Sequence, residues 1–348
     1  MEIKRLDWTL NFTIILLMAA GLLSLASTAP DLFWPQLLWC LLGLGIIILV
    51  ANFDWRPFVA RPWFSRGIYI IAIALLALTY FVAPTIRGVR AWIVIGPFQF
   101  QMSEFAKFAL ILIYSSFFAR GHAGIAHVKN LLLSLIYLVL PLLLVLVQPD
   151  MGTALILFGI WFGYLLVCGI KWKHLLAAVI IFAAVFVFMW NGFLENYQKD
   201  RISALFQPER DPLGINYSVI QSKIAIGSAG FLGKGFKQGT QSQLGFLPEA
   251  QTDFIFSSFT EEWGLLGAMA ILAVFFTMIF RIMRIGIFAD NNFSRFICLG
   301  ALLLFLLHFI LNIGSNLGLL PVIGVSFPFL SYGGSNLLIN SFLVGMVQ

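Results

Sequence analysis

Long runs of apolar residues recur along the whole sequence and limit the folds open to it. A helix of about 17–25 apolar residues crosses a bilayer. The chain is 61% hydrophobic and 10% charged, whereas soluble globular proteins carry about 25% charged residues. The sequence therefore predicts an all-α polytopic membrane protein, with residues 1–348 as a single transmembrane domain. We expect ten transmembrane helices, at residues 9–28, 32–51, 65–84, 103–119, 130–148, 151–169, 172–191, 260–281, 296–318 and 334–348.

The basic residues between these spans predict the orientation. If the N-terminus is cytoplasmic, twelve Lys and Arg residues flank the spans on that side, and only Arg87 and Arg90 lie in short loops on the other. Cytoplasmic loops carry the excess of Lys and Arg in membrane proteins. We therefore expect both termini in the cytoplasm, since ten spans return the chain to its starting side. The net charge of +6 is explained by these loops, and we expect no nucleic acid partner.

One long polar segment, residues 192–259, interrupts the pattern on the outer side. It holds six basic and six acidic residues. A connection of this length is usually functional or disordered, and the aliphatic and aromatic residues throughout it argue against disorder. Residues 216–231 are apolar enough to predict a short helix that lies on the membrane or dips into it. We expect a large extracytoplasmic loop with a function.

Glu104 and Lys107 lie three residues apart in an apolar run, so they share one face of a helix. Ser103 resembles the N-cap of that helix. Charged residues in a membrane helix face the protein interior and pair with one another. The spacing leaves two interpretations open, a functional site and a structural ion pair. His308 also lies in an apolar run, and we interpret it as a buried histidine with satisfied hydrogen bonds.

Two turns carry local signals. Asp150 follows Pro149 between two spans, and we expect its carboxylate to cap the next helix by accepting from amides near Thr153. The glycine-rich stretch GSAGFLGKG, residues 227–235, lacks the spacing of a phosphate-binding loop. We interpret it as a tight turn whose glycines let the backbone approach a lipid headgroup or another helix.

Asp253 stands at the outer border of the eighth span, in FLPEAQTDFIF. A partly desolvated carboxylate at such a boundary can act as a general base toward a hydroxyl or bind a divalent cation. Glu249 lies four residues earlier and can assist if the turn is helical. The alternative is an acidic residue that stabilises the N-terminus of a helix.

Two further features point to an interior site. Arg90 lies on the side depleted in basic residues, so it indicates either an anionic ligand or a charge at the rim of the bundle. Pro328 and the Gly333–Gly334 pair break the last span at its start, and broken helices at membrane depth line cavities. Ser331, Ser335 and Asn336 are candidates for that lining.

Four blocks resemble the SEDS family of shape, elongation, division and sporulation proteins. They are FQMSEFAK, QPDMGTAL, the long block from YSVIQSK to EEWGLLG, and PFLSYGGS, in the expected order over most of the chain. The stretch GTQSQLGFLPE is more similar to the rod-shape branch than to the division branch. The chain departs from the family pattern at Met102 and Ala229, which are conservative changes for the local geometry, and at Gly245 and Gln251, which affects only local contacts.

The resemblance implies a peptidoglycan glycosyltransferase of cell elongation, with a fold similar to the GT-C glycosyltransferases. Such enzymes polymerise lipid II at the outer face of the cytoplasmic membrane and form β-1,4 bonds with inversion. The donor is the nascent glycan on undecaprenyl pyrophosphate, and the acceptor is a lipid II hydroxyl. The implied partners are a class B penicillin-binding protein, which is a transpeptidase, and other membrane proteins of the elongation complex.

By the resemblance, Asp253 matches the essential Asp of the family and would activate the acceptor, directly or through Mg²⁺ or Mn²⁺. The pyrophosphate needs cations nearby. Residues assigned to substrate binding on these grounds are Arg90, Glu104, Lys107, Arg201, Arg210, Gln221, Ser222, Glu249 and Ser331.

Two other functions remain open. Broken helices and intramembrane charges also fit a lipid II flippase, although the charged residues cluster toward the outer side, which favours an interfacial enzyme. A scaffold for the transpeptidase is the third possibility. Substitution of Asp253 separates them, because it would abolish glycan formation and leave translocation or scaffolding intact.

Overall fold

The computed structural model describes residues 6–59, 61–84, 91–95, 98–121, 128–174 and 216–348, with scattered positions between 176 and 214. Nine long helices lie within these ranges. They are α1 (Trp8–Thr28), α2 (Pro30–Asn52), α4 (Pro62–Val82), α5 (Met102–Gly121), α6 (Val128–Val147), α7 (Met151–Val167), α12 (Ile255–Ile287), α13 (Asn292–Asn316) and α14 (Gly334–Val347). Shorter elements of the described part are α3 (Arg56–Val59), α10 (Tyr217–Ser228), α11 (Thr240–Gln243), β1 (Trp92–Ile95) and β2 (Phe98–Gln101).

Seven of the described helices are long and apolar enough to cross a membrane, and α7 and α14 are shorter apolar helices. The prediction of an all-α polytopic membrane protein is confirmed. Eight predicted spans match helices to within four residues at each end. The exception is α12, which begins at Ile255 rather than residue 260, so the predicted loop ends earlier than residue 259. The predicted span at 172–191 lies largely outside the described residues.

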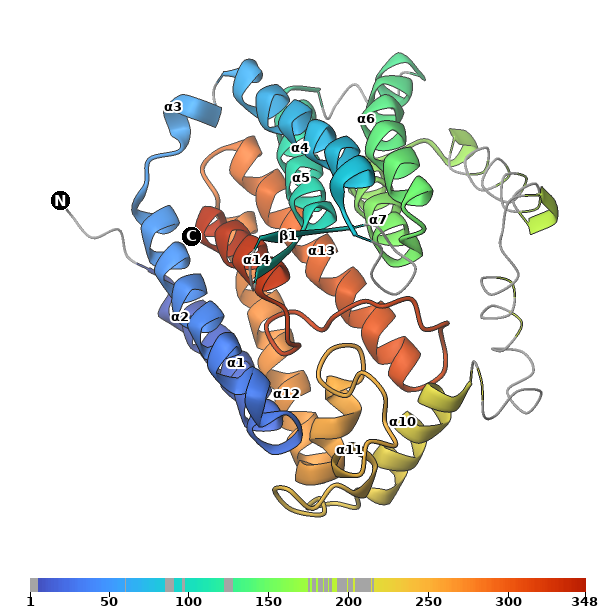
Figure 1. Ribbon diagram of the computed structural model, residues 1–348. Helices are drawn as coiled ribbons and strands as arrows, with labels where there is room; N and C mark the ends of the chain where they lie inside the picture. The colour runs from blue at the N-terminus through green and yellow to red at the C-terminus, as the bar shows by residue number, and fades with distance from the viewer. Residues whose placement is uncertain are drawn as a thin grey trace.

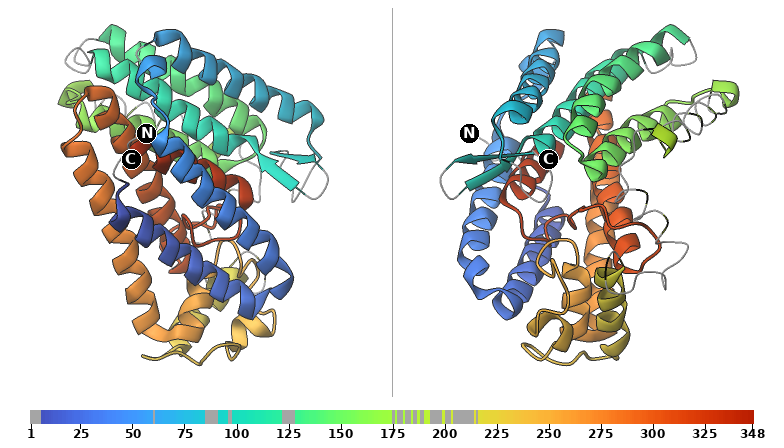
Figure 2. Two further views of the ribbon diagram at one scale, coloured as in Figure 1. Left: turned by 90° about the vertical axis from the view of Figure 1, so that its left-hand side faces the viewer. Right: turned by 45° about the vertical axis from the view of Figure 1, so that its right-hand side comes forward.

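The helices pack in pairs around a central helix. In the contacts between elements, α1 lies against α12, α2 against α14, and α5 against both α4 and α13. Helices α10 and α11 lie together at one end of the bundle, beside the start of α12 (Figure 1). We call this end, which holds residues 216–254, the loop end. The other views place α4 and α6 toward the opposite end (Figure 2).

Helix α5 is the most enclosed of the long helices. Its residues Ala109, Leu110, Ile111 and Leu112 are each 0% exposed. A helix that is apolar all round is stable only where other helices cover every face, and α4, α6, α7 and α13 surround it. Any polar side chain on α5 must therefore find its partners inside the protein.

A short hairpin precedes α5 and was not predicted. Strands β1 and β2 pair antiparallel, with Trp92 opposite Gln101 and Ile95 opposite Phe98. The four-residue strands are rich in β-branched and aromatic residues, which favour strands, but they are too short to stand out from a loop. Strand β2 runs directly into α5 and packs against α14, which ties the start of the central helix to the last helix.

The predicted cap of α7 is confirmed, and the predicted cap of α5 is wrong. Asp150 accepts from the Thr153 amide at 3.0 Å and from the Thr153 hydroxyl at 2.7 Å. Helix α5 begins at Met102, so Ser103 lies inside its first turn. The Ser103 hydroxyl lies 3.4 Å from that of Thr153, and it thereby joins the starts of α5 and α7.

Helix α12 is broken at Gly264, which has φ 71° and ψ −171°. The break leaves backbone groups without helical partners, and the glycine-rich turn supplies replacements. The Lys234 and Gly235 amides donate to the carbonyls of Glu261 and Glu262, both at 3.0 Å. The Leu265 and Leu266 amides donate to the carbonyls of Gly230 and Phe231, at 3.0 and 3.1 Å.

The glycines at this contact are needed for space as well as conformation. A Cβ on Gly233 would lie 2.1 Å from the Glu262 carbonyl oxygen, and one on Gly264 would lie 2.3 Å from the Gly233 nitrogen. The expectation that this stretch lets the backbone approach another helix is therefore confirmed. The predicted short helix before it is confirmed as α10.

Candidate functional site

Asp253 lies in the turn that leads into α12 at the loop end. The turn is closed by the Thr252 and Phe254 amides, which both donate to the Glu249 carbonyl at 3.1 Å. Phe254 is 1% exposed and anchors the turn, whereas the neighbouring Asp253 is half-buried. Its Oδ2 lies 3.8 Å from the position of a Cβ built on Gly324. The carboxylate therefore faces the irregular segment between α13 and α14 and keeps some access to solvent.

Two asparagines of α13 hold the backbone of Asp253. The Nδ2 atoms of Asn312 and Asn316 donate to the Asp253 carbonyl at 2.9 and 2.8 Å. Asn312 also donates to the Val325 carbonyl at 2.8 Å. Both asparagines are 0% exposed. Because one amide group contacts both segments, Asp253 and the segment containing Val325 have a fixed separation.

Ser222 of α10 joins the same network. Its hydroxyl lies 2.6 Å from the Ser257 hydroxyl and donates to the Asn316 carbonyl at 2.7 Å. Ser257 in turn donates to the Asn316 side chain. Ser222 is 0% exposed, so the structure gives it a different role from the expected substrate contact, namely fastening α10 to α12 and α13. Gln221, beside it, is half-buried.

Ser331 holds the turn from the opposite side. Its hydroxyl donates to the Thr252 carbonyl at 2.6 Å and accepts from the Phe327 amide at 2.8 Å. The Tyr332 amide donates to the Gln251 carbonyl at 2.9 Å. Ser331 is 6% exposed, so this expected substrate contact also proves to be a residue that positions Asp253. The irregular segment at the start of the last predicted span thus holds the turn of Asp253 through hydrogen bonds to its backbone carbonyls.

Glu249 is half-buried in the same turn, with φ 53°. Its Oε2 accepts from the Thr252 hydroxyl at 3.0 Å. A positive φ is uncommon for a residue other than glycine, and the hydrogen bonds that close the turn hold it in place. Glu249 and Asp253 therefore belong to one turn, as the sequence suggested.

Glu104 and Lys107 form a buried ion pair on α5, with 2.8 Å between Oε2 and Nζ. Lys107 Nζ also lies 3.0 Å from Nε2 of His308 on α13, and His308 Nδ1 lies 3.0 Å from the Ser326 carbonyl oxygen. Asn336 of α14 donates to Glu104 at 3.0 Å. The pair joins three helices, and Lys107 is 1% exposed, so it lies within the protein core rather than at a substrate surface.

His308, Asn312 and Asn316 follow one another at intervals of four residues, so they share one face of α13. This face connects the ion pair on α5 to the turn that carries Asp253. Neither asparagine was predicted from the sequence as a site residue. The signal was present, since three polar residues at this spacing in an apolar run indicate a buried polar face.

Two other carboxylates lie further along α12. Glu261, 0% exposed, accepts from Lys234 Nζ at 2.8 Å and from the Gln241 and Ser242 amides at 2.9 and 3.1 Å. It caps α11. Glu262 accepts from Ser27 and, at 3.2 Å, from Gln243. Both hold the loop to the bundle.

The described residues include no group of three or more His, Cys, Asp or Glu side chains able to hold a metal ion. Asp253 is half-buried and faces an irregular segment, which suits a single carboxylate ligand. Mg²⁺ commonly binds through one or two carboxylates together with substrate phosphates, so the donor set of this turn fits that mode. Arg90, Arg201 and Arg210 lie outside the described residues.

Comparisons with known proteins agree with these features. The family model described as cell cycle protein, which covers FtsW, RodA and SpoVE, matches residues 6–348. Peptidoglycan glycosyltransferase MrdB of Escherichia coli K12 is 38% identical over 307 residues, covering 88% of this chain and 82% of MrdB.

Two solved structures are similar over nearly the whole chain. A chain from a peptidoglycan synthase complex, studied for the coordination of polymerization and crosslinking, has a TM-score of 0.83 and 33% identity, covering 98% of this chain and 96% of that one. The rod shape determining protein RodA of Thermus thermophilus has a TM-score of 0.72 and 28% identity, covering 98% and 95%. This chain belongs to the FtsW, RodA and SpoVE family of cell cycle proteins, which is the SEDS family that its motifs resemble.

Proposed function

We propose that this chain is a peptidoglycan glycosyltransferase that polymerises lipid II during cell elongation. Membership of the family and the similarity to MrdB over 88% of the chain support this activity. The observation that carries the assignment of the site is the turn of Asp253. It presents a half-buried carboxylate on a backbone held by Asn312, Asn316 and Ser331. A base must be positioned before it can act, and this turn is held both by α13 and by the segment that precedes α14.

Asp253 is proposed as the general base. Its carboxylate accepts the proton of the acceptor hydroxyl on lipid II, and the oxygen attacks the anomeric carbon of the donor glycan. The bond from that carbon to undecaprenyl pyrophosphate breaks as the new β-1,4 bond forms, with inversion. Pyrophosphate leaves with the electron pair of the broken bond and requires stabilisation of its negative charge.

The cations proposed for that stabilisation are Arg90, Arg201 and Arg210, on the grounds given by the sequence. Lys107 is not proposed, because its ammonium group is buried against Glu104 and His308. Asp253 would also hold a Mg²⁺ or Mn²⁺ ion. Such an ion supplies positive charge beside the pyrophosphate oxygens when it is bound. Glu249, in the same turn, is the second carboxylate available to it.

The chemistry of the substrates also sets the proposed location. Lipid II and undecaprenyl pyrophosphate have long apolar chains and polar heads, so the site belongs at the membrane surface. We place the loop end at the outer face of the cytoplasmic membrane, with both termini cytoplasmic and residues 192–259 as the extracytoplasmic loop of one domain, residues 1–348. The similar chain from a synthase complex supports a class B penicillin-binding protein as the partner, together with other elongation proteins.

A lipid II flippase is the alternative. A transporter needs an open polar path across the membrane. The polar face of α13 runs deep into the bundle, but Asn312, Asn316 and Lys107 are at most 1% exposed and bonded to protein groups. In the described part of the chain, the polar face of α13 is therefore covered by other protein groups and forms no open path, so a polymerase explains these residues better than a flippase does.

Purified chain incubated with lipid II tests the proposal. Glycan strands should form with Mg²⁺ or Mn²⁺, and they should be lost with a chelator and in Asp253→Asn. Asp31→Asn is the matched control, because Asp31 is an exposed carboxylate in the first turn of α2, and it should polymerise normally. Glycan formation by Asp253→Asn at the normal rate rules out the assigned base. Translocation of lipid II in vesicles without polymerisation supports the flippase.

A further inference from the structure

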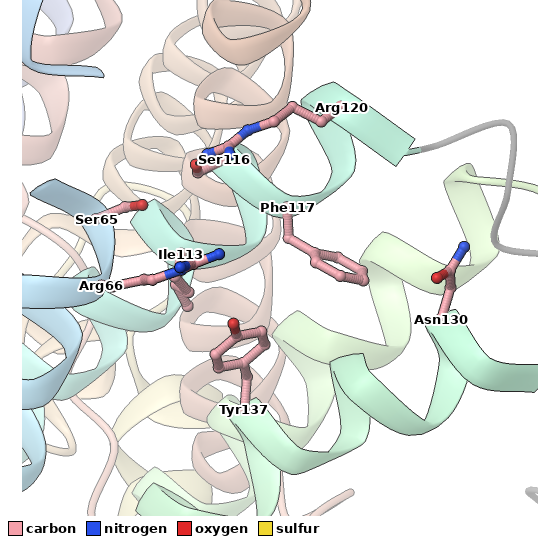
Figure 3. A pocket seen from close by; sticks show the side chains of 8 residues that line it. All are labelled: Ser65, Arg66, Ile113, Ser116, Phe117, Arg120, Asn130 and Tyr137. Carbon is pink, nitrogen blue, oxygen red and sulfur yellow. Dashed lines mark hydrogen bonds between the residues drawn. The ribbon is translucent and has the colours of Figure 1, made fainter. Parts of the chain in front are cut away.

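A basic pocket lies at the end of the bundle opposite to the loop end, between α4, α5 and α6. Its volume is about 200 Å³. Arg66 near the start of α4 and Arg120 near the end of α5 reach over it, and the Tyr137 hydroxyl of α6 points into it (Figure 3). Arg66 and Arg120 lie at the ends of α4 and α5 that point away from the loop end, so the pocket is separate from the turn of Asp253.

The charge of the pocket is uncompensated by its own lining. The eight lining residues include two arginines and no acid. Neither arginine forms an ion pair with a described carboxylate, whereas Arg281 in the last part of α12 pairs with Asp7. Arg120 donates through Nη2 to the Ser116 hydroxyl, which fixes its guanidinium and leaves other N–H donors for a ligand.

The hydrogen-bond donors and the apolar side chains that line the pocket indicate which kind of ligand it would bind. Two guanidinium groups with neighbouring hydroxyls match the oxygens of a phosphate, which arginine binds through paired hydrogen bonds. Ile113 and Phe117 form an apolar wall. Ile70, one turn further along α4 from Arg66, is 65% exposed. An apolar surface of α4 therefore continues from the two arginines toward the middle of the bundle.

We propose that this pocket binds the phosphate of an anionic phospholipid, with the headgroup between Arg66 and Arg120 and an acyl chain along the apolar face of α4. Basic pockets between membrane helices are suited to acidic lipid headgroups. The lipid headgroup would fill the pocket between α4, α5 and α6. It would thereby fasten α4 and α6 to the central helix without entering the proposed polymerase site.

Native mass spectrometry of the full chain in detergent tests this. The probes are phosphatidylglycerol, phosphatidylcholine and inorganic phosphate, each added in a titration. The wild type should retain phosphatidylglycerol and bind phosphatidylcholine weakly. The variant Arg66→Gln/Arg120→Gln should bind phosphatidylglycerol at least about tenfold more weakly, because it loses two sets of charged hydrogen bonds.

The matched control is Arg61→Gln/Arg295→Gln, which removes two exposed arginines of the same end that do not line the pocket. It should bind phosphatidylglycerol as the wild type does. Equal affinity in the two double variants overturns the proposal, and inorganic phosphate that binds as tightly as phosphatidylglycerol overturns the assignment to a lipid. If the glutamine variant does not fold, Arg66→Lys/Arg120→Lys keeps the charges without the paired donors. Its affinity should fall severalfold, and an unchanged affinity also overturns the proposal.

Discussion

Asp253 lies in the turn before α12 and Glu261 lies eight residues later, inside that helix, yet the surroundings of the two carboxylates differ. Around Asp253 the hydrogen bonds of Asn312 and Asn316 go to the backbone carbonyl, and the half-buried carboxyl keeps access to its surroundings. Around Glu261 the bonds go to the carboxylate itself, which is fully buried under α11 and Lys234. The two carboxylates therefore differ in burial: Glu261 holds structure from a fully buried position, and Asp253 is half-buried, as the proposed base requires.

The largest effect is expected at Asp253. In Asp253→Asn the amide cannot take a proton, and loss of a general base lowers a rate by about 10²–10⁴-fold. The melting temperature in detergent should stay near that of the wild type, since the backbone bonds that hold the turn remain. Initial rates of lipid II polymerisation, measured beside a thermal melt, check both halves. A large loss of stability would show that Asp253 resembles Glu261 after all.

The reverse pattern is expected at Glu261. Glu261→Gln replaces a buried acceptor of several hydrogen bonds and leaves Lys234 without its partner. The single side-chain oxygen of Gln cannot accept all the bonds that the two carboxylate oxygens accept from Lys234, Gln241 and Ser242. Each buried donor left unsatisfied costs about 1–3 kcal/mol, so the melting temperature should fall sharply and α11 should become sensitive to protease. At a temperature where the variant is still folded, its polymerisation rate per folded molecule should exceed that of Asp253→Asn. Normal stability would contradict the structural role.

Asn316 tests whether positioning matters separately from stability. Asn316→Ala removes the bonds to the Asp253 carbonyl and to Ser257, each worth about 1–3 kcal/mol when a buried group is left unsatisfied. We expect a lower kcat with a smaller change in KM, because the base is displaced while the substrate surface is retained. Asn316→Gln is the conservative comparison and should recover part of kcat. Equal losses in both variants, with stability falling in parallel, would make the role purely structural.

The smallest effect is expected at Lys234, whose side chain is 24% exposed. Lys234→Met should lower the free energy of unfolding by about 1 kcal/mol or less, because partly exposed ion pairs are weak. The difference from the wild type should shrink further in high salt. Thermal melts at two salt concentrations measure it. Comparison with Glu261→Gln then separates the ion pair from the backbone bonds that Glu261 makes to α11.

Most helices could be predicted because the bilayer sets both their length and their composition. Hydropathy placed the ends of α1, α2 and α14 within two residues of their observed limits. It failed at the start of α12, which was placed at residue 260 rather than Ile255, because Ser257 and Ser258 interrupt the apolar run there. Ser257 lies inside the helix because Ser222 and Asn316 supply hydrogen bonds from other parts of the chain.

The candidate site was predictable in part. The position of Asp253 at the start of an apolar run marked it in the sequence, and the spacing of His308, Asn312 and Asn316 was also legible there. The role of Ser222 was not, because a serine on a short helix can face solvent or protein equally well. Which face of α10 meets α12 depends on packing between segments distant in sequence.

The break at Gly264 has a mechanical consequence. Four backbone groups of α12 find their partners in residues 230–235, and unpaired backbone groups are strongly disfavoured where water is scarce. Residues 230–235 cannot separate from α12 without breaking these hydrogen bonds, so we expect the two segments to move as a rigid unit. A force applied to residues 230–235 would therefore be transmitted, through backbone contacts rather than through flexible side chains, to the turn of Asp253, which lies eleven residues upstream of the break.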